Sequence, residues 1–307
     1  MSVAFITHPE CLLHEMGEGH PERPERLGAI EDKLLAMRLD YLVARVEAPR
    51  ATREQLLRVH DALYLEALER MAPASGLVEI DPDTAMNPHT LPAAVRAAGA
   101  AVAGTDLVIA GQAEAAFCSV RPPGHHAERG RAMGFCFFNN VAVAAAHALE
   151  HHGLGRVAIA DFDAHHGNGT EDIFRDEQRV LMVSTFQHPF YPDSGVEGRS
   201  DRMVNVPLGA GSSGKEFRNA VTQDWLPALE RFRPELLLIS AGFDGHRDDG
   251  MAMLRLLEAD YAWVTQQLRV VAATHARGRI VSVLEGGYEL DVLGRCVAAH
   301  LGALCAD

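Results

Sequence analysis

Short apolar runs recur along the chain and predict β-strands. They are rich in Val, Ile, Leu and Ala, and they lack the polar alternation of strands that face water on one side. Continuous runs of this kind are typical of strands that are covered on both faces of a sheet. The predicted strands are residues 3–7, 115–120, 156–161, 180–185, 236–241 and 280–284.

Apolar residues at helical spacing occupy the segments between these strands. The predicted helices are residues 24–37, 91–110, 140–151, 216–232 and 258–275, and the last two stop before Pro234 and Gly278. This alternation of strands and helices predicts an α/β fold with a parallel sheet flanked by helices. No change of composition, low-complexity tract or repeat divides the chain, so we expect one domain over residues 1–307.

Four predicted strands run directly into polar, glycine-containing segments. In an open parallel sheet the carboxyl ends of the strands lie on one side, where ligands bind. We therefore expect these four segments to meet in one crevice. Their sequences are RPPGHH from residue 121, DFDAHHGNG from residue 161, GFDGH from residue 242 and EGGY from residue 285.

The composition narrows the classes of function and location. The formal net charge of −14 argues against a nucleic-acid partner and suits cationic substrates such as lysine-bearing peptides or polyamines. Five scattered cysteines without a CxxC pair predict free thiols in a reducing cytoplasm. The first residues lack the features of a signal peptide, and no run of about 18 uncharged apolar residues predicts a membrane span. We expect a cytoplasmic protein without a membrane partner.

Carboxylates and a histidine gather in the segment that follows the third strand. Asp161, Asp163 and His165 alternate there, and Asp244 follows a later strand in a glycine-rich turn. Two oxygens and one nitrogen suit zinc or a similar ion, and a catalytic zinc keeps a further position open. The plainer interpretation is a helix cap with solvated charges. We favour a metal site formed by Asp163, His165 and Asp244, because buried ionisable groups at strand ends need partners.

Paired histidines and a tyrosine lie in two of the other segments. His125 and His126 follow two prolines and Gly124, which together fix a tight approach of the chain. Histidine is suited to move protons near neutral pH, although a lone histidine is more often structural. Tyr288 follows two glycines and could donate a hydrogen bond to an oxyanion, or simply hold its loop in place.

Taken together, these motifs resemble the histone deacetylase and acetylpolyamine amidohydrolase superfamily, which has an arginase-type α/β fold. They occur in the order of that family and extend over nearly the whole chain. The branch of the family that carries asparagine at the position of Asn168 is the class II branch. The matching segments are residues 20–26, 121–127, 134–140, 161–169, 240–244 and 284–288.

The resemblance implies roles for individual residues. Zinc would be bound by Asp163, His165 and Asp244, although iron or cobalt suits the same ligands. His126, oriented by Asn168, would be the general base and then the acid, and His125, oriented by Asp161, would support the transition state. Tyr288 would bind the substrate carbonyl. Potassium would bind at a first site formed by Asp161, Asp163, His165, Ser184 and Thr185, and at a second formed by Phe174 and Val180.

The resemblance also implies a tunnel for the acylated side chain. Phe135 and Tyr191 would form its aromatic walls, and Gly134 would supply a carbonyl. Met251 corresponds to a position where polyamine deacetylases of the family tend to carry glutamate, although this methionine could also serve only to pack its loop. Because Met251 cannot pair with a distant amine, we favour acyl-lysine in a peptide or protein over an acetylpolyamine.

Other functions remain open at this stage. An acetylpolyamine or other small-molecule amidohydrolase is the main alternative. An arginase-like ureohydrolase would need a second pair of aspartates for two manganese ions, which the segments here lack. A non-catalytic binding module would be expected to have lost a ligand or Tyr288, and none is missing. The oligomeric state is left open.

Overall fold

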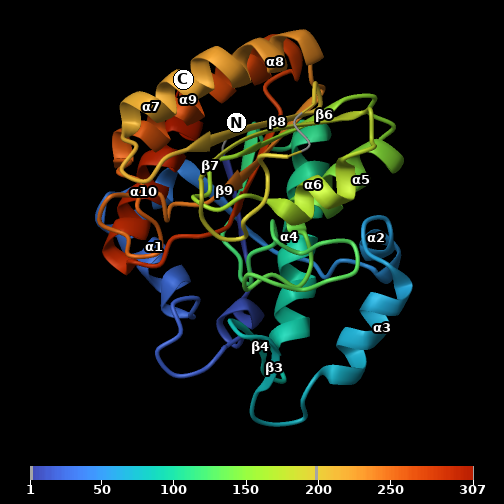
Figure 1. The fold of residues 1–307 in the computed structure, drawn as a ribbon. Coiled ribbons are helices and arrows are strands. Elements are labelled where there is room, and N and C mark those ends of the chain that lie inside the picture. Colours follow the sequence, from blue (N-terminus) through green and yellow to red (C-terminus); the bar gives the residue numbers. More distant parts are fainter. Residues whose placement is uncertain (1–2, 198–199, 307) are drawn as a thin grey trace.

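Eight parallel strands form one sheet at the centre of the molecule (Figure 1). The structure is a computed structural model that describes residues 3–197 and 200–306. The strands lie in the order β2-β1-β5-β10-β9-β6-β7-β8. Their bounds are β1 Val3–Thr7, β2 Val43–Glu47, β5 Ala115–Cys118, β6 Val157–Asp161, β7 Val180–Gln187, β8 Met203–Leu208, β9 Leu236–Ala241 and β10 Ile280–Leu284.

The six predicted strands are all present, and the predicted parallel sheet is confirmed. Every residue of β5, β6, β7, β9 and β10 is buried, which explains their continuous apolar sequences. The edge strands β2 and β8 were not predicted, because both are partly exposed and polar residues interrupt their apolar sequences. Pro207 lies within β8, where an edge strand tolerates the missing N–H.

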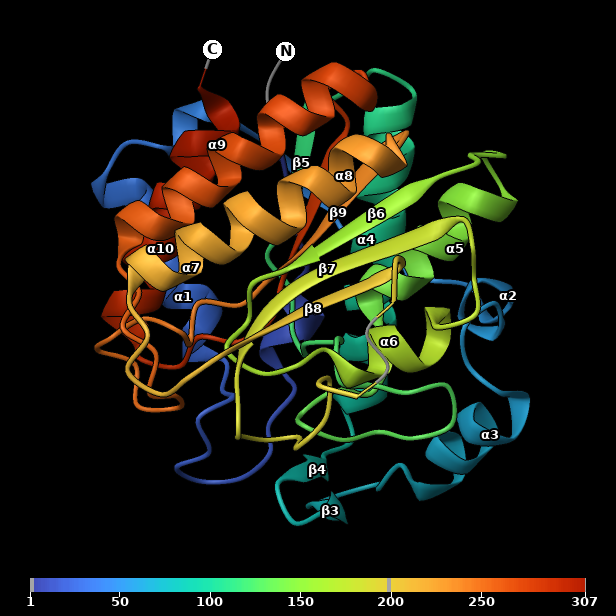
Figure 2. The same cartoon turned by 45° about the horizontal axis from the view of Figure 1, so that its top comes forward.

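Helices cover both faces of the sheet (Figure 2). One layer contains α1 (Glu25–Ala36), α7 (Gly214–Ala220), α8 (Leu226–Phe232), α9 (Glu258–His275) and α10 (Leu290–Cys305). The other layer contains α4 (Thr90–Ile109), α5 (Asn140–Glu150) and α6 (Asn168–Phe174). Short elements complete the chain: the 3-10 turns Pro9–Leu12 and Asp40–Leu42, the helices α2 (Arg53–Leu57) and α3 (Ala62–Met71), and a separate hairpin of β3 (Val78–Asp81) and β4 (Thr84–Met86).

The structure departs from the helical prediction in several elements, and the helices α2, α3 and α6 were not predicted. Residues 216–232 were predicted as one helix, but a π-helical turn, Val221–Trp225, separates α7 from α8. Pro227 near the start of α8 has no N–H to continue the preceding hydrogen bonds, which accounts for the interruption. The helix α10 was not predicted. Its Gly294 allows close packing on α1, since a Cβ there would lie 2.8 Å from the carbonyl oxygen of Ala29.

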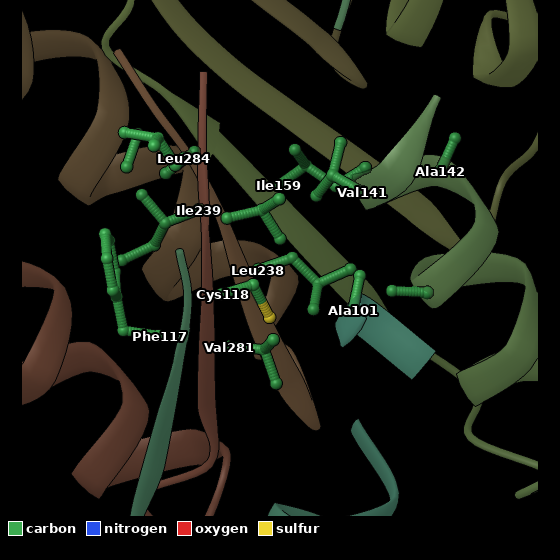
Figure 3. Packing of buried hydrophobic residues seen from close by; sticks show 14 of the residues in the cluster. Ala101, Phe117, Cys118, Val141, Ala142, Ile159, Leu238, Ile239, Val281 and Leu284 are labelled. Atoms are coloured by element: carbon green, nitrogen blue, oxygen red, sulfur yellow. The ribbon is translucent and has the colours of Figure 1, made fainter. Parts of the chain in front are cut away.

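The Ala-rich helices α4 and α5 pack directly on the sheet. Ala101, Val141 and Ala142 from these helices lie beside the side chains of Ile159, Leu238 and Val281 (Figure 3). Among the described residues, α4 is the one helix long and apolar enough to cross a membrane, but 61% of its apolar window is buried in the protein. That burial is typical of a core helix, because its small side chains allow close contact with the strands.

All five cysteines are free thiols, as predicted, and four of them are buried.

Candidate metal centre and active site

Four loops meet at the carboxyl edge of the sheet, as their strand ends predicted. Their strands β5, β10, β9 and β6 are neighbours in that order, which brings together residues far apart in the sequence. The loops after β5, β6, β9 and β10 carry, in this order, His125 and His126, Asp163 and His165, Asp244, and Tyr288.

Asp163, His165 and Asp244 form one buried cluster, with a nitrogen or oxygen of each within 4.8 Å of the others. His165 Nδ1 lies 3.0 Å from Asp163 Oδ1 and 3.0 Å from Asp244 Oδ2. The second oxygen of each carboxylate accepts a backbone hydrogen bond, from Gly286 N to Asp163 Oδ2 (2.8 Å) and from Ala164 N to Asp244 Oδ1 (2.9 Å). Both carboxylates are thereby fixed with one oxygen facing the imidazole.

The charges of this cluster fit a bound cation. Burial and the neighbouring Asp163 raise the pKa of Asp244 to about 6, which is the cost of holding two carboxylates together away from water. Asp244 Oδ2 is buried and accepts no hydrogen bond from the described residues. Burial alone would lower the pKa of His165. The neighbouring carboxylates of Asp244 and Asp163 outweigh this effect, and the pKa of His165 is raised to about 10. Two carboxylate oxygens and one imidazole nitrogen, gathered in a buried cluster, suit zinc.

Glycines explain how the carboxylates come so close to the neighbouring loops. A Cβ at Gly286 would lie 2.6 Å from Asp163 Oδ2, and a Cβ at Gly242 would overlap the same carboxylate. Side chains at these two positions would push the loops after β9 and β10 away from the metal ligands. The glycine-rich character of both segments is therefore a requirement of the site.

His125 and His126 lie beside the cluster with their rings 4.1 Å apart. His125 Nδ1 is 3.0 Å from Asp161 Oδ2, and His126 Nδ1 is 2.8 Å from Asn168 Oδ1. Asn168 Nδ2 donates to Glu128 Oε1 at 2.8 Å, which turns the amide oxygen towards His126. His126 therefore donates through Nδ1, and its Nε2 carries the lone pair that a general base needs.

The two histidines have opposite electrostatic surroundings. Burial, followed by the nearby His125 and His165, holds the pKa of His126 well below its usual range, so its imidazole is neutral. Burial also opposes protonation of His125, but Asp163 and Asp161 outweigh it and raise the pKa of His125 to about 10. One imidazole is thus a neutral proton acceptor, and its neighbour carries positive charge.

Tyr288 is held by three different parts of the chain. Its backbone N–H donates to Asp249 Oδ2 at 2.7 Å, and the guanidinium of Arg26 lies 4.9 Å above its ring. The ring of Phe135 meets that of Tyr288 edge to face at 5.8 Å. Burial raises the pKa of Tyr288 well above its usual range, so its hydroxyl remains a donor.

Among the predicted tunnel residues, Tyr191 and Gly134 lie next to His126. The ring of Tyr191 meets that of His126 edge to face at 5.3 Å. Phe135 has a φ of 68° and follows Gly134 with a φ of 55°, so a tight turn presents its ring. Met251 is partly buried against the core, and its N–H donates to Asp249 Oδ1 at 3.0 Å. Asp249 therefore accepts hydrogen bonds from both the Tyr288 loop and the Met251 loop. The sequence analysis did not identify this residue.

Two further contributors were missed by the sequence analysis. Phe190 stacks on the ring of His165 at 5.4 Å, next to the predicted Tyr191. Glu22, Arg26 and Arg121 form a fully buried ion cluster behind the loop of Tyr288. Arg26 and Glu22 lie in a segment that carries the family resemblance, but nothing in its local pattern assigns a partner to either side chain.

The predicted potassium ligands occupy two separate places. Asp161 and Ser184 are direct neighbours across β6 and β7, and Ser184 Oγ donates to Asn205 Oδ1 at 3.0 Å. Thr185 follows Ser184 in the same strand, and Asp163 and His165 of this set also belong to the metal cluster. Phe174 ends α6 and Val180 begins β7. Both potassium sites stay predictions.

A parallel α/β sheet with a buried Asp-His-Asp cluster and a neutral imidazole beside it defines the class of metal-dependent hydrolases. The family model described as histone deacetylase domain matches residues 20–304, and the chain belongs to this family of amidohydrolases.

Relatives agree in sequence and in structure. The chain is 40% identical over 325 residues to a histone deacetylase-like amidohydrolase of Pseudomonas aeruginosa, which covers 98% of this chain and 85% of that protein. It is 36% identical over 329 residues to polyamine deacetylase HDAC10 of Homo sapiens, covering 100% of this chain and 48% of that protein. The crystal structure of the HDA15 HD domain matches 99% of this chain and 88% of that chain, with a TM-score of 0.92 and 33% identity.

Proposed function

We propose that this protein is a zinc-dependent deacylase that hydrolyses the amide of an acylated lysine side chain in a peptide or protein. The observation that carries the proposal is the position of His126. Its lone pair is fixed by the Asn168 hydrogen bond, beside a cluster of two carboxylates and one imidazole. Zinc bound by Asp163, His165 and Asp244 would supply Lewis acidity to the amide carbonyl and to the attacking water.

The residues around the cluster divide the work of amide hydrolysis. His126 Nε2 would accept the proton of the attacking water and later return it to the leaving amine. The charge of His125, held by Asp161 at 3.0 Å, would stabilise the negative charge that develops on the carbonyl oxygen. The neutral hydroxyl of Tyr288 would donate a hydrogen bond to the same oxygen.

Tyr288 offers a direct test of this assignment. Tyr288→Phe keeps the ring against Phe135 and Arg26 and removes only the hydroxyl. We expect turnover of an acetyl-lysine peptide to fall on the order of 10²–10³-fold, with a small change in KM, as for other oxyanion donors. Unchanged turnover would remove Tyr288 from the mechanism.

The apolar walls near the site support an acyl-lysine substrate. Phe135 and Tyr191 would enclose the methylene chain, and the carbonyl of Gly134 would lie within the tunnel. Met251 offers no negative charge to a distant amine. We also propose a cytoplasmic location. We further propose that the protein binds structural potassium ions, which would raise its Tm in KCl above its Tm in a chloride salt of a larger cation.

Acetylpolyamine hydrolysis is the second candidate, and it is favoured by the similarity of this chain to 48% of the length of a human polyamine deacetylase. Turnover of acetyl-lysine peptides, longer acyl-lysine peptides and acetylspermidine separates the two. We expect the wild-type protein to prefer a lysine peptide, and Met251→Glu to shift the preference towards acetylspermidine. Met253→Glu is the matched control, because Met253 is an exposed methionine two residues away. Preference of the wild-type protein for acetylspermidine would overturn the lysine assignment.

A further inference from the structure

A second group of histidines lies at the carboxyl end of α5. His147 is in the last turn of the helix, His151 follows as its cap, and His152 is the next residue. The described residues contain two groups of at least three potential metal ligands with their atoms within 4.8 Å of one another. One is the Asp163 cluster, and the other consists of these three histidines.

The three rings face one another closely. His147 and His151 are one helical turn apart and stack at 4.7 Å between centroids. His152 meets both of them edge to face, at 5.2 Å from His147 and 4.9 Å from His151. Three imidazoles with a nitrogen of each within 4.8 Å of the others are ligands that zinc, nickel and cobalt accept in proteins.

Asp106 of α4 orients two of these rings. Its Oδ1 lies 2.8 Å from His147 Nε2 and 2.6 Å from His152 Nε2. A carboxylate that accepts the Nε2 proton leaves the lone pair of the imidazole on Nδ1, which is how metal-binding histidines are held in protein sites.

A cation already faces the lone pair of His147. Arg58 Nη1 lies 3.0 Å from His147 Nδ1, and a guanidinium can only donate, so His147 Nδ1 must be the acceptor. Arg58 also pairs with Glu54 at 3.2 Å, which gives its side chain an alternative partner. Displacement of Arg58 would leave His147 Nδ1 free to bind a metal ion.

We propose that His147, His151 and His152 bind one transition-metal ion, with Asp106 as the orienting carboxylate and Arg58 as the cation that the metal displaces. This site is separate from the Asp163 cluster. The helix α5 begins among the loops of the active site and ends before β6, so its carboxyl end lies at the opposite edge of the sheet. A bound ion would be held at the carboxyl end of α5, away from the substrate tunnel.

Metal stoichiometry tests the proposal. Protein loaded with one equivalent of zinc is equilibrated with micromolar free Zn²⁺ by dialysis, and bound zinc is measured by elemental analysis. We expect two equivalents in the wild-type protein and one in the double variant His151→Ala, His152→Ala. The control is His89→Ala with His275→Ala, which removes two histidines elsewhere and should keep both equivalents. Turnover of an acetyl-lysine peptide should be the same in all three proteins.

Two single variants test the assigned roles. Asp106→Asn should weaken binding of the second zinc by about 10–100-fold, as loss of an orienting carboxylate does. Arg58→Gln should strengthen it by about tenfold, because a charge-assisted hydrogen bond no longer competes. One equivalent in the wild-type protein, two in the His151–His152 double variant, or weaker binding in Arg58→Gln would each overturn the proposal.

Discussion

Replacing Glu22 with Gln should destabilise the protein severely, because Glu22 is the carboxylate that pairs with two buried guanidinium groups. Its carboxylate lies 2.5 Å from both Arg121 Nε and Arg121 Nη2, and 3.1 Å from Arg26 Nη1. The side chains of Glu22, Arg26 and Arg121 are all inaccessible to water. Glu22→Gln keeps the shape and leaves both cations without a counter-charge. Breaking a buried ion pair in this way costs about 3–5 kcal/mol of unfolding free energy.

The same substitution should reduce turnover. Arg26 donates to the carbonyl oxygens of Gly287 (2.7 Å) and Glu285 (2.5 Å), on either side of Gly286 in the loop that carries Tyr288. When Arg26 loses its carboxylate partner, this loop loses its support. A displacement of about 1 Å at a reacting group can lower the rate about 10²-fold. We expect kcat to fall more than KM rises.

Urea unfolding at pH 7 measures the first effect and steady-state kinetics the second. Glu31→Gln is the control, because Glu31 also pairs with an arginine, Arg45 at 2.6 Å, but at the surface. Such an exposed pair contributes about 0–1 kcal/mol. If Glu22→Gln and Glu31→Gln lost similar amounts of stability, the reasoning from burial would be refuted.

Three further predictions concern the active site, its metal and the core. Gly134→Ala would place a methyl group 2.8 Å from Cγ of His126, so kcat should fall about 10²-fold. The control variant Gly130→Ala has room for the added methyl group and should retain activity. Equal rates in the two variants would contradict the assignment of His126. Removal of zinc by a chelator should abolish turnover, Zn²⁺ but not Mg²⁺ should restore it, and activity that survived complete removal would exclude metal catalysis. Burial lowers the pKa of His300 to about 3, so its proton binds preferentially to the unfolded chain, and stability should be lost as pH falls below the unfolded value of about 6.5. Between pH 7 and pH 5 the free energy of unfolding measured in urea should fall by roughly 2 kcal/mol. The variant His300→Gln should lose less unfolding free energy over the same range. An equal loss in the variant would show that other groups cause it.

The sequence predicted the centre of the fold better than its edges. The strands β6, β7, β9 and β10 are buried on both faces, so an unbroken apolar run was sufficient to find them. The edge strand β2 faces water along much of its length and reads as a loop. The helix α10 contains Gly294, which lowers helix propensity but is needed where α10 contacts α1. Tertiary packing determines β2 and α10, and the local pattern of apolar residues carries no information about that packing.

The candidate site divides in a similar way. The meeting of Asp163, His165 and Asp244 was predictable, because parallel strands end at the same edge of a sheet. The contacts of Glu22 with Arg121 join positions 99 residues apart and could not be read from either segment. His147, His151 and His152 do carry a sequence signal, since their spacing brings three rings to one helix end. Asp106 and Arg58 come from other helices, and only the fold brings them there.

The order of strands in the sheet has a consequence for how the metal centre forms. The strand β6 leads to two of the ligands and β9 leads to the third, and they are neighbours in the sheet. In the chain they are separated by β7, β8 and the helices α6, α7 and α8. A nascent chain that has not yet made β9 therefore holds only two ligands. We therefore expect tight zinc binding to begin only when β9 pairs with β6. The time at which zinc is bound would then report how far this sheet has assembled.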